Sequence, residues 1–289
     1  MSEIRRVGVV GCGLMGSGIA EVCARAGTHV IVREIDLAAA EVGRRRIERS
    51  LERGVKAGKI EASQREAALE RLEYTTDLAA LADSDIVIEA VMEAEAAKVE
   101  IFEALGRVIK NPDAILASNT SSIPIMKLAM ASGRPHTVLG LHFFNPVPVL
   151  ELVELVASLL TSHEIAERAA SFAEHVLHKR VIRSRDRAGF IVNQLLIPYQ
   201  LAAIRMVESG FATHADIDTG MVKGCNHPMG PLALADLIGL DTVLAVAKSL
   251  YEEFKEPLYA PPPLLSRLVE AGLLGRKTGR GFYEYPARS

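Results

Sequence analysis

Short apolar runs, each followed by a polar stretch or by sequence of helical period, recur through the first two thirds of the chain. Runs of this length that are rich in Val, Ile, Leu and Ala predict buried strands. They lie at Val7–Val10, His29–Glu34, Ile86–Glu89, Ala114–Ala117 and Val138–His142, with a further strand-like stretch around Val181. Because these strands alternate with helical sequence, the pattern predicts an α/β fold with a doubly wound, mostly parallel sheet.

Two helical regions stand apart from this alternation. Residues 37–72 are polar, alanine-rich and helical in pattern over a longer stretch than a crossover helix needs, which predicts a helical excursion from the sheet. Beyond a boundary near residues 186–189 the pattern is mainly helical. The helical segments there are Gly189–Gly210, Asp216–Cys225, Pro231–Phe254 and Pro263–Ala271. We therefore predict two domains, residues 1–187 with the excursion at about 37–72, and a smaller all-α domain at residues 188–289.

The composition of the 289-residue chain narrows the classes of partner. Hydrophobic residues make up 49% of it, and with a net charge of −3 and a pI near 6.3 nothing favours nucleic acid or an anionic membrane. The chain does not start like a signal peptide, and polar residues and Pro198 interrupt the apolar segment 189–210, so we expect a cytoplasmic protein. Cys12, Cys23 and Cys225 are odd in number and lack metal-site spacing, so we expect reduced thiols and no metal.

A glycine motif occupies the segment Val7–Ala20, VGVVGCGLMGSGIA, where the first strand passes into a helix. Strand, Gly11-x-Gly13-x-x-Gly16 and helix in this order form the fingerprint of a Rossmann-type dinucleotide-binding domain. The first glycine permits the turn, the second leaves room for pyrophosphate, and the third lets helix and strand pack closely. We expect the phosphates at the helix N-terminus. The predicted cofactor-binding residues of this loop are Gly11, Gly13, Leu14, Met15 and Gly16.

The second strand ends in an acidic side chain, Glu34, where a carboxylate would hydrogen-bond the adenosine ribose 2′-hydroxyl. A carboxylate there also repels a 2′-phosphate, which favours NAD over NADP. Arg33 beside it is of the type that accommodates the extra phosphate, and Asp36 is a rival for the acidic role. We therefore predict NAD as the cofactor, with Glu34 as the ribose ligand.

Polar residues follow the later strands of the predicted sheet, and topology brings such strand ends to one crevice. Oxidation of an alcohol to a ketone needs a group that accepts the hydroxyl proton, and His142 is the candidate. Glu154 lies beyond a proline-containing turn and is predicted to return and hold the imidazole, with Glu151 as the alternative carboxylate. Ser121 and Asn193 are candidate hydrogen-bond donors to the substrate oxygen.

Five longer motifs, spread over essentially the whole chain, resemble those of the L-3-hydroxyacyl-CoA dehydrogenase family, most closely its bacterial hydroxybutyryl-CoA members. They are ASNTSSIPI (117–125), GLHFFNPVPVLELVE (140–154), GFIVNQLLIPY (189–199), HPMGPLALADLIGLDT (227–242) and GRKTGRGFYEY (275–285). The resemblance implies His142 as acid/base, Glu154 as its partner, and Ser121 and Asn193 as contacts of the substrate oxygen. It further implies a homodimer built through the helical domain. The residues that it implies for the cofactor site are Glu93, Lys98, Asn145 and Lys277.

A basic flank of the helical excursion bears on the substrate. Arg45, Arg49 and Arg53 recur at helical spacing with Lys56 nearby, and such a flank can dock the phosphates of coenzyme A. We predict Arg53 and Lys56 as substrate-binding residues. The predicted substrate is an acyl-CoA, and the resemblance to the bacterial members of the family favours 3-hydroxybutyryl-CoA. Interleaved glutamates also fit a solvated surface. Two alternatives stay open, namely a relative that oxidises the sugar acid gulonate, which needs no basic flank, and a non-catalytic NAD-binding protein.

Overall fold

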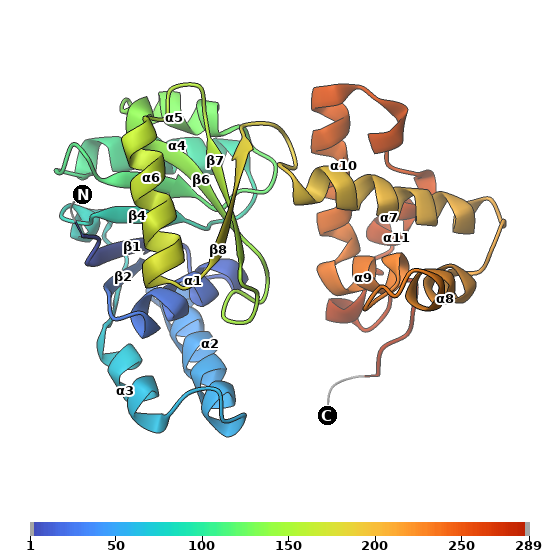
Figure 1. Cartoon of the computed structure of the whole chain (residues 1–289), viewed down its shortest axis with the longest axis horizontal. Helices are drawn as coiled ribbons and strands as arrows, with labels where there is room; N and C mark the ends of the chain where they lie inside the picture. Colours follow the sequence, from blue (N-terminus) through green and yellow to red (C-terminus); the bar gives the residue numbers. More distant parts are fainter. Residues whose placement is uncertain (1–2, 287–289) are drawn as a thin grey trace. The chain divides into compact units, whose positions relative to one another are not determined.

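The computed structural model describes residues 3–286 of the chain, which divides into two compact units, Met1–Arg187 and Ala188–Ser289 (Figure 1). The first unit is built around an eight-stranded sheet of order β3-β2-β1-β4-β5-β6-β7-β8. The strands are β1 (Arg6–Val10), β2 (His29–Arg33), β3 (Leu72–Thr75), β4 (Ile86–Glu89), β5 (Ile115–Ser118), β6 (Val138–Phe143), β7 (Leu152–Ala157) and β8 (Arg180–Arg185). All neighbouring strands pair in parallel except β6 and β7. The predicted doubly wound, mostly parallel sheet is confirmed.

Helices cover both faces of this sheet, which explains why a central strand such as β4 is buried along its whole length. Residues of α1 and α6 share a core cluster with the strands, for example Ile19 and Ile165 with Val9. Helices α4 and α5 pack against each other, and Figure 1 shows them across the sheet from α6. The helices of this unit are α1 (Leu14–Arg25), α2 (Leu37–Lys56), α3 (Ala62–Glu70), α4 (Glu95–Val108), α5 (Ile125–Ala131) and α6 (His163–Ser171), with a turn of π-helix at Phe172–Val176.

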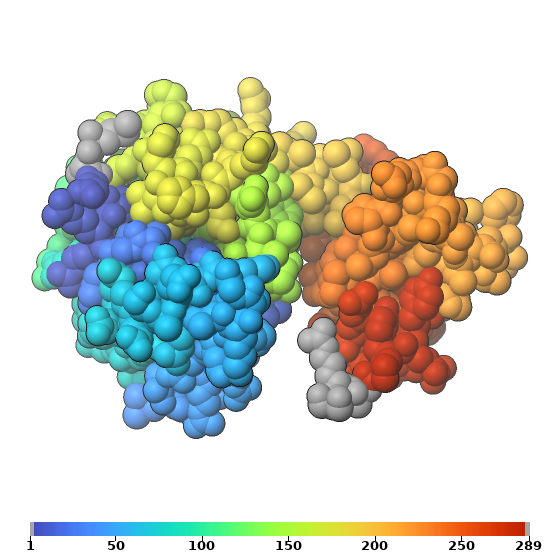
Figure 2. All heavy atoms as spheres, turned by 60° about the horizontal axis from the view of Figure 1, so that its bottom comes forward, coloured from blue at the N-terminus to red at the C-terminus, as the bar shows by residue number. Residues whose placement is uncertain are grey.

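Helices α2 and α3 form the outer lobe of the first unit (Figure 2, blue and cyan spheres). Buried residues of α2, Ile47 and Leu51, join the main core. Most of its basic residues are exposed, but Arg46 donates to the Cys12 carbonyl at 2.9 Å. Asp36 begins this helix, because its side chain accepts the Ala39 N–H at 2.7 Å. Two helices, α2 and α3, therefore fill the predicted excursion, and the strand β3 follows them.

Two strands differ from the predicted pattern. The short strand β3, LEYT, was not predicted because it follows directly on helical sequence and lacks an apolar run. The strand β7 was not predicted as a strand either, because its apolar residues continue from a proline-containing loop. It runs antiparallel to β6, so the sheet is mixed at this side.

The second unit consists of helices around its own core. They are α7 (Val192–Glu208), α8 (His214–Gly224), α9 (Pro231–Ile238), α10 (Leu240–Phe254) and α11 (Pro263–Glu270). The single helical segment predicted at 231–254 is two helices, because Gly239 between them adopts a φ of 106°, a conformation that a helix cannot contain. Among residues 3–286 no helix is long and apolar enough to cross a membrane.

Candidate active site

The glycine loop between β1 and α1 is shaped by contacts that only glycine permits. Gly11 has a φ of 90°, and a Cβ on Gly16 would lie 1.8 Å from the carbonyl oxygen of Gly11. Gly13, the residue before α1, would place a Cβ in open space with no atom within 4 Å, and no side chain caps the helix there. The first turn of α1 therefore presents free backbone N–H groups to an open space, which suits a phosphate. Of the two residues between the last glycines, Leu14 is exposed and Met15 packs on the core.

Glu34 lies directly after β2 and faces this loop. Its carboxylate accepts hydrogen bonds from the backbone N–H of Cys12 and, at 3.0 Å, of Ile35. Its neighbour Arg33 donates to the Thr76 carbonyl at 3.2 Å. Asp36, the rival acidic residue, is engaged as the cap of α2. Among the two neighbouring carboxylates, Glu34 is thus the one at the glycine loop.

A cavity of about 530 Å³ opens beside Gly11, Gly13 and Glu34, at the carboxyl ends of β1, β2 and β4. Apolar side chains such as Met92 and Ile101 form much of its wall. An open glycine loop, a carboxylate and an apolar wall around one cavity fit the pyrophosphate, ribose and adenine of a dinucleotide. The residues of the structure therefore fit the cofactor that the motif predicts.

Ser121, His142 and Glu154 form one hydrogen-bonded chain. His142 Nδ1 lies 2.7 Å from Glu154 Oε2, and His142 Nε2 lies 3.0 Å from Ser121 Oγ. His142 and Glu154 sit directly opposite each other in the antiparallel register of β6 and β7, and are 4% and 0% exposed. Phe144 packs edge-on against the imidazole, with ring centroids 4.6 Å apart. Glu151, the alternative carboxylate, instead lies 3.8 Å from exposed Arg180.

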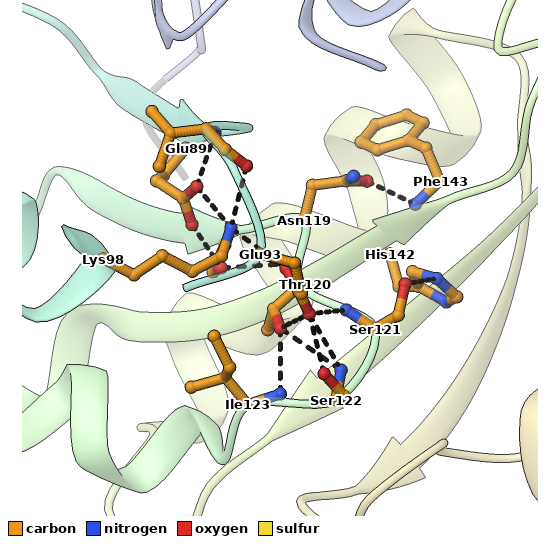
Figure 3. A network of polar contacts seen from close by, with 12 residues as sticks. Glu89, Glu93, Lys98, Asn119, Thr120, Ser121, Ser122, Ile123, His142 and Phe143 are labelled. Carbon is orange, nitrogen blue, oxygen red and sulfur yellow. Dashed lines mark hydrogen bonds and ion pairs between the residues drawn. The ribbon is translucent and has the colours of Figure 1, made fainter. Parts of the chain in front are cut away.

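Glu93 and Lys98 belong to a polar network behind Ser121 (Figure 3). Lys98 Nζ is buried, 2.5 Å from Glu89 and 3.3 Å from Glu93. Burial pushes the pKa of Glu93 upward, but Lys98 and hydrogen bonds from the loop after β5 outweigh it and hold the pKa below its ordinary value. Sequence reasoning missed Glu89; its one signal was a carboxylate that ends an otherwise apolar strand.

Asn145 is exposed just after β6, at the start of the loop that leads to β7. This loop is anchored by Lys179, whose Nζ donates to the carbonyls of Val147 and Leu150, both at 2.7 Å. Burial lowers the pKa of Lys179. The sequence did not predict a role for Lys179, because a lysine before an edge strand resembles an ordinary surface residue.

The remaining predicted residues lie elsewhere. Asn193 is in the first turn of α7, and Lys277 lies in a 3₁₀ turn where its Nζ is 2.5 Å from Asp241; both belong to the helical unit. Arg53 and Lys56 are exposed on α2, and Lys56 pairs with Glu52 at 2.7 Å. Within the first unit, the structure thus brings together the serine, histidine and glutamate, and separately groups the glycine loop with Glu34.

Two family models cover nearly the whole chain. The one described as 3-hydroxyacyl-CoA dehydrogenase, NAD binding domain, matches residues 6–187, and the one described as 3-hydroxyacyl-CoA dehydrogenase, C-terminal domain, matches residues 189–285. The chain belongs to the 3-hydroxyacyl-CoA dehydrogenase family. The family resemblance of the five sequence motifs is thereby confirmed.

Relatives of this 3-hydroxyacyl-CoA dehydrogenase are similar to it in sequence and structure over nearly its whole length. It is 61% identical to the 3-hydroxybutyryl-CoA dehydrogenase of Mycobacterium tuberculosis, over 98% of this chain and 99% of the relative. The crystal structure of FadB2 from M. tuberculosis matches with a TM-score of 0.97 at 61% identity, covering 98% of this chain and 100% of that one. The (S)-3-hydroxybutyryl-CoA dehydrogenase of Ralstonia eutropha matches with a TM-score of 0.92 at 44% identity, covering 98% and 99%. The chain is an NAD-dependent dehydrogenase, and the prediction of NAD as cofactor is confirmed.

Proposed function

We propose that this dehydrogenase interconverts 3-hydroxybutyryl-CoA and acetoacetyl-CoA with NAD(H), and that His142, paired with Glu154, is its general acid/base. The observation that carries the mechanism is the chain of hydrogen bonds from Ser121 through His142 to Glu154. The substrate is supported by two relatives, 61% and 44% identical to this chain, which are both 3-hydroxybutyryl-CoA dehydrogenases. A basic helix in the first unit fits the coenzyme A part of such a substrate.

The carboxylate decides which imidazole nitrogen reacts. Because Glu154 accepts from Nδ1–H, the other nitrogen, Nε2, carries the exchangeable proton on the side of Ser121. In ketone reduction, Nε2–H of the imidazolium protonates the carbonyl oxygen as a hydride reaches the carbonyl carbon; in alcohol oxidation, Nε2 takes the hydroxyl proton. Glu154 stabilises the imidazolium in either direction. The Ser121 hydroxyl can donate to the substrate oxygen while its charge grows.

The cofactor site draws on the glycine loop and the residues around it. We propose that Gly11, Gly13, Leu14, Met15 and Gly16 hold the pyrophosphate and that Glu34 binds the adenosine ribose. When bound, NADH supplies the hydride and NAD⁺ accepts it. The further residues that we propose for cofactor binding are Glu93, Lys98, Asn145 and Lys277. Asn193 of α7 is proposed as a second donor to the substrate oxygen.

The mechanism is tested by His142→Ala, assayed by NADH oxidation with acetoacetyl-CoA. We expect kcat to fall by about two to four orders of magnitude while NADH affinity is kept, because only an interaction of the transition state is lost. The matched control is His175→Ala, which removes an exposed histidine whose Nδ1 lies 3.1 Å from the Ser171 carbonyl. Near wild-type turnover in folded His142→Ala would refute the mechanism, and no oxidation of NADH by the wild type would exclude this substrate.

The coenzyme A part of the proposal rests on the exposed basic residues of α2. The double variant Arg53→Ala, Lys56→Ala should raise KM for acetoacetyl-CoA several-fold and weaken its dependence on salt, because fewer charge contacts remain to be screened. KM for NADH should not change. Lys110→Ala, which removes an exposed lysine paired with Asp83, is the control. An unchanged KM for acetoacetyl-CoA would leave α2 a solvated surface and reopen the sugar-acid alternative.

We also propose that the enzyme is a homodimer formed through the helical unit. Its helix α7 exposes Leu195 at 73%, beside an apolar cavity of about 600 Å³ whose wall includes Ile191, Leu196 and Met229. Apolar surface of this kind in a helical unit is suited to a second copy. Sedimentation equilibrium should give a dimer mass, and Leu195→Asp should shift it toward the monomer; a monomeric wild type would contradict the proposal.

A further inference from the structure

Glu89 is a buried carboxylate to which the reaction assigns no role. It ends β4, is 0% exposed and pairs in register with Ser118 of β5. Its Oε2 accepts the Ser118 hydroxyl at 2.6 Å, while its Oε1 accepts the Val91 N–H at 2.7 Å and Lys98 Nζ at 2.5 Å. A buried charge is costly unless it is fully paired, so these contacts define a fixed position for the group.

Lys98 connects this carboxylate to a second one. The lysine is 1% exposed on α4, and its Nζ lies between Glu89 at 2.5 Å and Glu93 Oε2 at 3.3 Å, with the Val91 carbonyl at 3.4 Å (Figure 3). These three acceptors match the three donors of an ammonium group. The position of Glu93 therefore depends on Lys98, and that of Lys98 on Glu89.

Glu93 in turn holds the irregular loop that follows β5. Its other oxygen, Oε1, accepts the hydroxyls of Thr120 at 2.5 Å and Ser122 at 2.9 Å, and the backbone N–H groups of Ser121 at 2.9 Å and Ser122 at 3.2 Å. Residues 119–122 form neither helix nor strand, so such contacts take the place of a regular ladder. This is the loop that presents Ser121 Oγ to His142 at 3.0 Å.

A second line of contacts runs from Glu89 to the same loop. Ser118 Oγ, while donating to Glu89, accepts the Thr120 N–H at 3.2 Å. The Asn119 N–H donates to the backbone carbonyl of Glu89 at 2.9 Å, and the Asn119 side chain accepts the Phe143 N–H at 2.8 Å, next to His142. Glu89 thus reaches the loop from both sides.

We propose that Glu89 is a positioning residue for catalysis, which fixes Ser121 against His142 through Ser118 on one side and through Lys98 and Glu93 on the other. The inference rests on the proposed role of Ser121 in the reaction. Glutamine in place of Glu89 keeps the shape but offers one oxygen and one amino group, so it cannot accept at both ends. Lys98 then keeps a single carboxylate, Glu93, and draws it away from the loop.

The test is Glu89→Gln, alone and combined with Ser121→Ala, measured as kcat with acetoacetyl-CoA together with Tm. We expect Glu89→Gln alone to lower kcat about tenfold, because a small displacement of a reacting group is enough for such a loss. In the Ser121→Ala background the same substitution should change kcat less than about twofold, since groups that act through one another are not additive. The control is Glu95→Gln, which removes a carboxylate at the start of α4, the helix that carries Lys98. Glu95 pairs there with exposed Lys127, and its replacement should leave kcat unchanged.

The outcomes separate this inference from the proposed function. If Ser121→Ala leaves kcat unchanged, the role of the serine fails. If Ser121→Ala lowers kcat and Glu89→Gln does not, or lowers it equally in both backgrounds, the positioning role is overturned. Should Glu89→Gln not fold, Ser118→Ala removes the 2.6 Å contact with Glu89 and the 3.2 Å contact with the Thr120 N–H, and should lower kcat several-fold with the same dependence on Ser121. Full activity of that variant would overturn the inference too.

Discussion

Replacing Glu154 by glutamine isolates the charge of the proposed catalytic pair. The carboxylate is 0% exposed and lies 2.7 Å from His142 Nδ1, opposite it in the register of β6 and β7. Glutamine has the same shape, and its amide oxygen can still accept the hydrogen bond from Nδ1–H. The orientation of the imidazole should therefore persist while the negative charge beside it is lost.

The size of the effect follows from the distance. With the two charge centres roughly 4 Å apart and an effective dielectric constant of about 20, a carboxylate stabilises an imidazolium by about 4 kcal/mol. The amide dipole of glutamine replaces part of this, and about 1.4 kcal/mol corresponds to a factor of ten in rate. We therefore expect Glu154→Gln to lower kcat by about 10²-fold.

Steady-state oxidation of NADH with acetoacetyl-CoA measures this loss, and Tm and KM for NADH show whether the fold and the cofactor site persist. Glu151→Gln is the matched control, because Glu151 is exposed and lies beside Arg180. It should leave kcat within about twofold of the wild type. A folded Glu154→Gln enzyme with kcat within about threefold of the wild type would refute the argument, because the imidazolium would then not depend on the buried charge.

Three further results are expected. Gly13→Ala should keep Tm, since its Cβ meets nothing within 4 Å, but should weaken NADH binding at least tenfold. Gly16→Ala should lower Tm as well, because its Cβ would lie 1.8 Å from a carbonyl oxygen. Equal Tm values of the two variants would contradict this. The ratio of kcat/KM for NADH to that for NADPH should exceed about ten because of Glu34, and an equal or reversed ratio would make Arg33 the governing residue. The pKa of Glu93 is lower in the folded state than its ordinary value of 4.5, so the charged carboxylate stabilises the fold at pH values above 4.5. This stabilisation is lost as the pH falls through the folded pKa. A plot of Tm against pH should therefore fall in this acid range for the wild type, and Glu93→Gln should lack that fall.

The sequence predicted those parts of the molecule that depend on local pattern. Apolar runs located the central strands, and the glycine spacing predicted a turn at Gly11 and close packing at Gly16, where a Cβ would lie 1.8 Å from the Gly11 carbonyl oxygen. The helical period of residues 231–254 gave no sign of a break, because Gly239 differs from an ordinary helical glycine only in its φ of 106°. Local pattern thus finds elements more easily than the points where they end.

Contacts between distant elements could not be predicted in the same way. Glu154 was paired with His142 by reasoning from a turn, but the antiparallel strand that places it there was not foreseen. Glu89 was recognised only as the end of a strand, because its partner Lys98 lies on a different element, α4, and contacts it only in the folded protein. The direction of a strand and the pairing of buried charges are set by packing of the whole unit, which no single segment encodes.

The antiparallel register of β6 and β7 has a consequence for how the enzyme can be altered. Because side chains alternate between the two faces of a strand, a slip of one residue would carry Glu154 to the face away from His142, and a slip of two would move it by about 7 Å. Extra residues inserted in the loop 144–151, by contrast, leave the ladder and its partners in place. The pairing of His142 with Glu154 therefore depends on the register of β6 and β7 and not on the length of the loop between them.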